Sequence, residues 1–239
     1  MSNILEKIYK LKKEHIIKSK NILSEEKLIK KAFECVPCRN FTASLTKNIN
    51  EGRPALIAEI KKASPSAGLI RKNFDLKLIA KSYYNAGAAC LSILTDTPFF
   101  QGKDNYIAEA KNTVPIPILR KDFIIDKYQI YESKYIGADC ILLIMALLKT
   151  NEAKEFTYIA KSLGLDVLIE VHNKKELEQA LKIPSTLLGI NNRNLKNLKV
   201  DITTTEKLLR DIPDDRDVIS ESGFSSHKEI NYIIGKGVF

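Results

Sequence analysis

The sequence has no apolar run approaching the roughly 20 residues that a membrane-spanning helix requires. Its first 20 residues carry charges throughout and lack the apolar segment of a secretory signal. These two absences predict a cytoplasmic protein that does not enter a membrane. No GxGxxG turn follows the first predicted strand, so a dinucleotide-binding crevice has no support. The 239 residues, 44% of them hydrophobic, suit one globular unit with a sizeable core.

Cysteine is scarce, and its placement argues against metal or redox chemistry. Cys35 and Cys38 form a CxxC, but no further ligands stand nearby at the spacing of a zinc site. The pair also follows a helical segment, whereas a redox CxxC opens a helix after a strand. Cys90 and Cys140 lie in apolar runs and are predicted to be small core residues. We therefore predict no metal site.

Acidic residues are outnumbered, and the formal net charge is +9. Residues 1–31 hold nine Lys against four Glu, which suits a surface for nucleic acid or anionic membrane. No RNA-binding signature and no stripe of Arg and aromatic residues accompanies this charge. Ile4, Ile8 and Leu11 recur at helical spacing instead, separated by Lys7, Lys10, Lys12 and Lys13. We favour a solvated helical face and predict neither nucleic acid nor membrane as a partner.

From about residue 50, short apolar runs alternate with amphipathic stretches. Seven strands are predicted over residues 55–61, 89–95, 116–122, 139–145, 166–172, 187–192 and 217–222. Helices are predicted over residues 75–86, 126–136, 150–163, 173–182, 203–210 and 225–234. Near-continuous apolarity predicts parallel strands buried on both faces and joined by right-handed crossovers.

Local signals define the ends of several of these helices. Three glycines precede strands where a left-handed turn would end the helix: Gly87, Gly137 and Gly164. Three side chains are expected to cap helix N-termini: Asp75, Asn151 and Asn173.

The polar residues favour a (β/α)8 barrel over an open doubly wound sheet. In a barrel, reactive groups come from the carboxyl ends of many different strands. Five predicted strands end in such groups, namely Glu59 and Lys61, Lys121, Glu170, Asn191, and Glu221 with Ser222. Alternation along the first strand places Glu59 and Lys61 on one face, so both are expected to point into the barrel mouth. The alternative to a functional site is a set of polar residues that only closes the barrel. One charged pair would suffice for that, so polar groups on five strands favour a site.

These motifs resemble the indole-3-glycerol phosphate synthase family, a (β/α)8 lyase of tryptophan biosynthesis. The segment IAEIKKASPSAGLI (57–70) is similar to its signature. The similarity continues in the same order through residues 87–102, 117–132, 137–144, 168–172 (LIEVH), 189–195 (GINNRNL) and 219–223 (ISESG), and includes an N-terminal extension with ILEKI (4–8).

The resemblance implies ring closure, decarboxylation and dehydration of 1-(2-carboxyphenylamino)-1-deoxyribulose 5-phosphate, without a metal or organic cofactor. It assigns the general acid to Lys121 and the late general base to Glu170. Lys61 is expected to meet anionic groups of the substrate, with Glu59 tuning the lysines. Asn191 and Glu221 match positions that hold substrate hydroxyls and the charge network.

The resemblance also implies substrate contacts outside this group. The aromatic ring would meet an apolar wall of Pro65, Phe100, Phe123 and Leu195, and Ser64 belongs to the same loop as Pro65. The phosphate would be held by Lys61, Arg193 and the backbone at Ser222 and Gly223. We expect no histidine in the site, with His172 at the rim of the barrel and His15 and His227 in helical stretches.

The chain departs from the family pattern at its C-terminus. We expect an N-terminal helical extension over residues 1–50 and a barrel over residues 51–239, together one domain. Seven of eight strands are present, with Val238 and Phe239 as the first residues of strand eight. Two alternatives stay open, a non-catalytic truncated remnant and, more weakly, another phosphosugar isomerase on this fold. We expect a monomer or a weak homodimer.

Overall fold

A curled sheet of seven parallel strands forms the centre of the computed structural model, which describes residues 3–195 and 197–238 except the side chains of residues 3 and 4. The strands pair in the order β1-β4-β5-β6-β7-β8-β9. Their bounds are β1 (Ile57–Ile60), β4 (Cys90–Leu94), β5 (Ile118–Lys121), β6 (Cys140–Ile144), β7 (Asp166–Val171), β8 (Leu187–Asn191) and β9 (Asp217–Glu221). Each lies within its predicted range.

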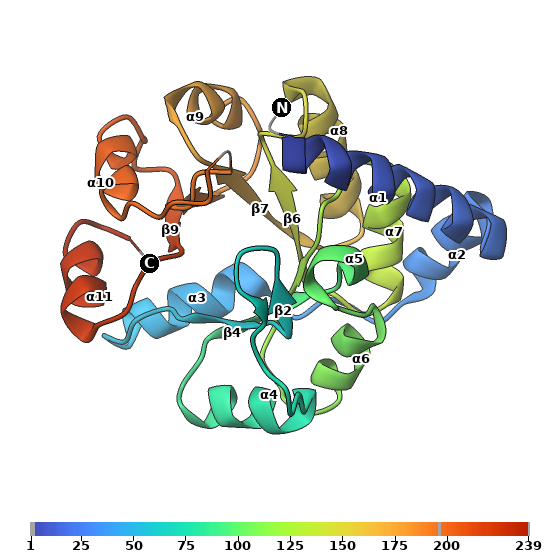
Figure 1. Ribbon diagram of the computed structural model, residues 1–239, viewed down its shortest axis with the longest axis horizontal. Helices are drawn as coiled ribbons and strands as arrows, with labels where there is room; N and C mark the ends of the chain where they lie inside the picture. Colours follow the sequence, from blue (N-terminus) through green and yellow to red (C-terminus); the bar gives the residue numbers. More distant parts are fainter. Residues whose placement is uncertain (1–2, 196, 239) are drawn as a thin grey trace.

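Helices surround this sheet (Figure 1). The six predicted ones are confirmed as α4 (Leu76–Asn85), α7 (Lys127–Tyr135), α8 (Thr150–Ser162), α9 (Lys174–Ala180), α10 (Thr203–Leu209) and α11 (His227–Ile234). The structure adds elements that were not predicted: α5 (Thr97–Phe100), α6 (Asn105–Lys111) and an antiparallel hairpin of β2 (Ala63–Ser64) and β3 (Gly68–Leu69). Helix α5 and strands β2 and β3 have only two to four residues, which is too few for a periodic pattern, and α6 has seven.

The predicted barrel architecture is confirmed, with strands β1 and β9 at the two ends of the sheet. No pairing joins these two strands in the part of the chain that the structure describes. Val238 is buried but is not in a strand, and Phe239 lies outside the described residues.

Strand register determines which side chains face the barrel interior. Leu94 pairs with Lys121, and Ile144 pairs with Glu170. Glu170 in turn pairs with Gly189, and residue 191 of β8 pairs with residue 221 of β9. Because side chains of neighbouring strands at paired positions share a face, this register places Lys121, Glu170 and Glu221 on the interior face of the sheet.

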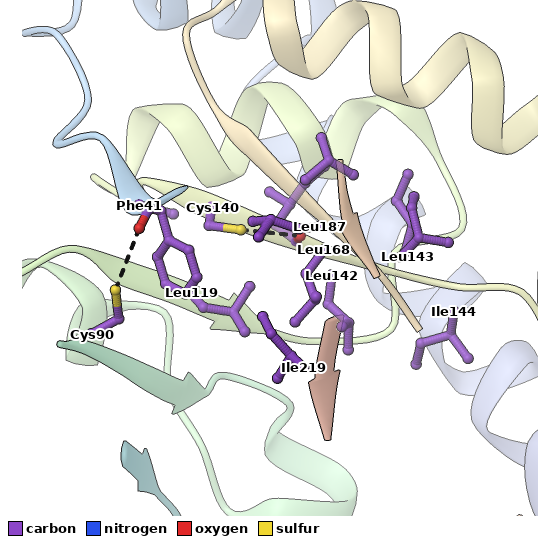
Figure 2. Close-up of a cluster of buried hydrophobic side chains, with 14 of the residues drawn as sticks. Phe41, Cys90, Leu119, Cys140, Leu142, Leu143, Ile144, Leu168, Leu187 and Ile219 are labelled. Carbon is purple, nitrogen blue, oxygen red and sulfur yellow. Dashed lines mark hydrogen bonds between the residues drawn. The ribbon is translucent and has the colours of Figure 1, made fainter. Parts of the chain in front are cut away.

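Away from the polar carboxyl ends of the strands, the interior of the barrel is apolar and is packed with residues of several strands (Figure 2). Cys90 and Cys140 are fully buried there, as predicted, and their thiols donate to the carbonyl oxygens of Phe41 and Ile141. Phe41 begins α3 (Phe41–Asn50), and its ring lies close to Leu119 of β5 in Figure 2. The helices before the barrel therefore share its core.

Three glycines adopt the left-handed conformation that was predicted, at Gly87, Gly137 and Gly164. Asp75 and Asn173 cap their helices by accepting from the backbone N–H three residues on. The prediction for Asn151 is wrong, because α8 begins one residue earlier at Thr150. Its N-terminus is closed instead by Glu152, whose carboxylate accepts from the backbone N–H of Lys149.

The N-terminal helix α1 (Asn3–Ile22) is not simply a solvated basic face. It buries Leu5, Ile8 and Ile16, while Leu11 is half-buried and the side chain of Ile4 lies outside the described part. Lys12 lies on the buried face and is only 5% exposed. The prediction is therefore wrong for Lys12, whose ammonium is 2.8 Å from Asp96 and 2.7 Å from Asp122. Helix α2 (Glu25–Glu34) follows and packs on α7.

No helix among the described residues is long and apolar enough to cross a membrane.

Candidate active site

Lys121 is the centre of a cluster of charges at the carboxyl ends of the strands. Its ammonium is 3.1 Å from Oε2 of Glu170 and also forms an ion pair with Oε2 of Glu221. The three residues come from β5, β7 and β9, which are not neighbours in the sheet. The side chains of Lys121 and Glu221 are 16% and 15% exposed, and that of Glu170 is 3% exposed. Three of the predicted catalytic residues therefore meet in one nearly buried group.

The electrostatics of this cluster separate its two carboxyl groups. Burial raises the pKa of Glu221 and the charge of Glu170 adds to this, so that its pKa reaches about 7 in spite of Lys121. Burial also acts on Glu170, but Lys121 and His172 outweigh it and hold the pKa of Glu170 well below its usual range. Burial lowers the pKa of Lys121, but Glu170 and Glu221 outweigh burial and the pKa is raised. Near neutral pH the cluster therefore holds an ammonium, a carboxylate and a carboxyl group that exchanges its proton.

Glu59 and Lys61 form an ion pair with each other at the end of β1. Their side chains are 35% and 31% exposed, so they lie at the open edge of the mouth. The charge of Glu59 also acts on Lys121 and Glu221, raising the pKa of both. The pair thus belongs to the same electrostatic group as Lys121, at its more solvated side.

Asn191 lies beside the cluster, at the end of β8. Its side-chain oxygen accepts from the hydroxyl of Ser222 at 3.0 Å and from the backbone N–H of Arg193 at 3.0 Å. The guanidinium of Arg193 donates to the carbonyl oxygen of Leu198 at 3.0 Å, so it is turned along its own loop. Ser222 and Gly223 both have positive φ, and they form a tight turn directly after β9.

The predicted apolar wall is brought together in part. The rings of Phe100 and Phe123, which follow β4 and β5, lie with their centroids 6.1 Å apart. Leu195 packs against the main core, and Pro65 is exposed in the turn between β2 and β3. The hydroxyl of Ser64 accepts from the backbone N–H of Ala67 and helps to shape that turn.

His172 was not expected in the site, and its predicted place at the rim is wrong. It follows β7 two residues after Glu170 and therefore points to the same side. Its ring is 7% exposed, with Nε2 at 3.2 Å from Oε1 of Glu170 and Nδ1 at 3.0 Å from Oε2 of Glu176. The available signal was the shared parity of Glu170 and His172, together with Glu176 four residues later at the start of α9.

Asn192 was not among the predicted site residues, and it positions the residues around the site by hydrogen bonds. Its amide donates to Ser220 Oγ and to the carbonyl of Ser222, each at 3.1 Å. Its oxygen accepts from the backbone and hydroxyl of Thr205 in α10. Asn192 therefore fixes the turn after β9 to the turn after β8 with a buried amide.

Gly189 leaves the room that Glu221 occupies. A Cβ at position 189 would lie 2.4 Å from Oε1 of Glu221 and 3.4 Å from Leu168. The same carboxylate oxygen is buried and finds no hydrogen-bond partner among the described residues. One carboxylate oxygen of Glu221 therefore contacts the ammonium of Lys121, and the other lies next to the backbone of Gly189.

A separate hollow of about 730 Å³ lies at the opposite, amino end of β7 and β8, where Asp166 and Lys161 line it. Asp166 there accepts from the backbone N–H groups of Phe41 and Thr42, so its charge holds the start of α3. The carboxyl-end cluster around Lys121 is therefore the better candidate for chemistry.

Comparison of this sequence with known proteins finds one matching family model and relatives that carry the same name. The sequence model described as "Indole-3-glycerol phosphate synthase" matches residues 5–238. A protein of that name from Azospirillum brasilense is 51% identical over 84% of this chain and 77% of its own. Another from Caldanaerobacter subterraneus subsp. tengcongensis is 48% identical over 98% of this chain and 89% of its own.

Solved structures of lower identity share the fold. A chain from a structure of the tryptophan synthase α2β2 complex of Pyrococcus furiosus is 15% identical, with a TM-score of 0.55 over 77% of this chain and 84% of its own. The N-acetylmannosamine-6-phosphate 2-epimerase of Clostridium perfringens is 13% identical, with a TM-score of 0.55 over 77% of this chain and 82% of its own.

Proposed function

Because this chain belongs to the indole-3-glycerol phosphate synthase family, we propose that it converts 1-(2-carboxyphenylamino)-1-deoxyribulose 5-phosphate to indole-3-glycerol phosphate, releasing carbon dioxide and water. It would then act as a carboxy-lyase. The observation that carries this proposal is the buried ammonium of Lys121, held between the carboxylates of Glu170 and Glu221. Such a group can give a proton to an oxygen that becomes negative during the reaction.

The first chemical step needs an acid at the ketone of the substrate. A ring carbon of the anthranilate attacks the ketone carbon, and the ketone oxygen gains negative charge as the new bond forms. Lys121 supplies the proton to that oxygen, which gives an alcohol. Loss of carbon dioxide then returns the electron pair to the ring.

The second half of the reaction removes a hydroxyl group as water and a proton from the ring system. Glu170 takes the proton, because its carboxylate is kept ionised by Lys121 and His172. Glu221, with a pKa of about 7, can return a proton to the amine of Lys121 after the first step, and the restored ammonium can protonate the leaving hydroxyl group. The two carboxyl groups therefore serve different roles although they contact the same ammonium.

Binding of the substrate would use the more open parts of the mouth. Phe100 and Phe123 face the aromatic ring, together with Pro65, Leu195 and Ser64. Lys61, with Glu59 beside it, meets the anionic groups, and Asn191 meets a hydroxyl. Arg193 and the turn at Ser222 and Gly223 are proposed for the phosphate, whose oxygens suit backbone N–H donors.

The setting of the enzyme is part of the same proposal. We propose a monomer or weak homodimer that acts on a small phosphorylated substrate. The cytoplasmic location stays a prediction from the charged N-terminus.

Turnover by the purified 239-residue chain, followed by indole fluorescence, tests this proposal. We expect Lys121→Ala to lower kcat by about 10²–10⁴-fold with little change in KM, because its charge acts on the transition state. Lys161→Ala is the matched control, since this exposed lysine lies at the other end of the strands. Normal turnover by Lys121→Ala would exclude Lys121 as the acid, and an inactive wild-type chain would contradict the proposed reaction.

A further inference from the structure

His172 stands between two carboxylates that come from different elements. Its Nε2 is 3.2 Å from Oε1 of Glu170 in β7, and its Nδ1 is 3.0 Å from Oε2 of Glu176 in α9. The backbone N–H of His172 donates to the same oxygen of Glu176 at 2.9 Å. Asn173 fixes the other oxygen of Glu176 by donating from its amide at 2.7 Å. The imidazole is therefore anchored by hydrogen bonding on the Glu176 side, while its Nε2 faces Glu170 within ion-pair distance and has no hydrogen-bond partner among the described residues.

The two carboxylates determine the protonation state of this ring. An ionised carboxylate only accepts hydrogen bonds, and a neutral imidazole has a single N–H. A neutral His172 would turn a lone pair toward Glu170 or Glu176, whereas an imidazolium gives Glu176 a hydrogen bond from Nδ1 and places positive charge 3.2 Å from Glu170. Burial alone lowers the pKa of His172, but the hydrogen bonds and charges of Glu170 and Glu176 outweigh it and raise the pKa to about 9.

The cation of His172 also completes an alternation of charge across the site. Glu170 meets a cation at each oxygen, with His172 at Oε1 and Lys121 at Oε2. Lys121 continues the sequence to Glu221. From α9 to β9 the order is therefore Glu176, His172, Glu170, Lys121, Glu221, with opposite charges at each contact. Among the described residues, Glu59 of β1 also faces this chain of charges, together with Lys61, its ion-pair partner.

We propose that His172 is a positioning residue which, as an imidazolium anchored by Glu176, fixes the orientation and the negative charge of Glu170. This inference rests on the proposed function, in which Glu170 is the late base. Without His172, one oxygen of Glu170 would be buried without a cation, and the carboxylate would be free to turn toward Lys121 with both oxygens. Glu176 acts one step further away, by keeping the imidazole charged.

The charge of His172 is tested without substrate by NMR titration of the histidine C2–H signals in the whole chain. The sequence has three histidines, and the signal of His172 is the one that His172→Asn removes. We expect it to titrate near pH 9 in the wild type and about one to three units lower in Glu176→Gln, which keeps the shape of the side chain and removes its charge. Glu178→Gln, an exposed glutamate of the same helix, should leave the signal unmoved. A wild-type titration near pH 6.5, or no shift in Glu176→Gln, would overturn the proposal.

The pH profile of kcat/KM tests the action on Glu170. His172→Asn removes a cation from Glu170, so the pKa of Glu170 rises and the acidic limb should move up by about one unit or more. Glu176→Gln should move the alkaline limb to lower pH, because His172 then loses its proton earlier. A uniform loss of activity with unchanged limbs would show a structural role only and would overturn the proposal. An inactive wild type whose His172 titrates near pH 9 would contradict the proposed reaction while supporting the Glu176–His172–Glu170 chain.

Discussion

Arg120, Lys121 and Asp122 are consecutive in the sequence, yet they belong to two different networks of buried charge. Alternation along β5 turns Lys121 into the barrel, toward Glu170 and Glu221. It turns Arg120 and Asp122 outward, between the sheet and the surrounding helices. Both networks have largely buried centres, and they differ in whether a group in them titrates near neutral pH.

The outer network saturates the guanidinium of Arg120 with hydrogen bonds. Each guanidinium nitrogen of Arg120 has an acceptor, drawn from Thr95, Gln129, Ser133, Asp104, Asp122 and Glu132. Asp122 in turn is 2.7 Å from the ammonium of Lys12, which joins α1 to the barrel. Burial raises the pKa of Asp122, but Lys12 and Arg120 outweigh it and hold this pKa far below neutral. Lys12, Arg120 and Asp122 therefore stay charged at every physiological pH.

The inner network leaves a proton free to move. Glu221 has a pKa of about 7, and one of its oxygens has no hydrogen-bond partner among the described residues. Burying charge is thus common to both sides of β5 and does not itself indicate catalysis. A group that titrates near neutral pH does, because it can give and take a proton under working conditions.

The largest effect expected from this comparison is on stability, at Arg120. Arg120→Leu leaves Asp104, Asp122 and Glu132 without their common partner, and should lower the free energy of unfolding by about 3–5 kcal/mol. Lys121→Leu should cost less, because Glu221 takes up a proton when the ammonium is gone. Urea unfolding of the two variants, at equal pH, measures the difference. Equal losses would show that the two networks stabilise the fold alike.

The next effect is a pH dependence that belongs to Glu221. Its pKa in the folded protein, about 7, lies above its ordinary value of 4.5. The folded state therefore binds more protons between these values, and the stability from this group is lost as pH rises through 7. Glu221→Gln lacks this loss, so between pH 5 and pH 8 its stability should rise against the wild type by about 3 kcal/mol. Unfolding curves at both pH values measure it, and a constant difference would contradict the raised pKa.

Much of this organisation was predictable from the sequence, because the barrel depends on local periodicity. The apolar runs predicted the strands, and the capping residues Asp75 and Asn173 helped to predict the helices. The alternation of side chains along each strand predicted that Lys121 and Glu170 face the barrel interior. The same argument, applied two residues further, would have placed His172 beside Glu170. The outer network was not predictable, because Lys12 meets Asp122 only when a helix from the far N-terminus folds onto β5.

A smaller effect is expected from filling the space at Gly189. Gly189→Ala puts a Cβ 2.4 Å from Oε1 of Glu221, so the carboxylate must leave its place beside Lys121. We expect kcat to fall by about tenfold to a hundredfold, the cost of a displacement near 1 Å. Gly235→Ala, at the end of α11, is the control because its added Cβ meets nothing nearer than 3.4 Å. Unchanged turnover in Gly189→Ala would mean that the position of Glu221 does not limit the reaction.

The smallest expected effect is on stability, from removing one hydroxyl group on each side of the sheet at β4. Thr95 faces outward, where its hydroxyl donates to Asp122 at 2.6 Å and accepts from Arg120 at 3.2 Å. Thr95→Val should therefore cost about 1–2 kcal/mol of stability and leave turnover unchanged. Ser92 faces inward, and its buried hydroxyl has no hydrogen-bond partner in the described part of the chain. Ser92→Ala should leave stability equal or slightly higher, since no hydrogen bond is lost. A greater loss there than in Thr95→Val would contradict the contrast between these two hydroxyls.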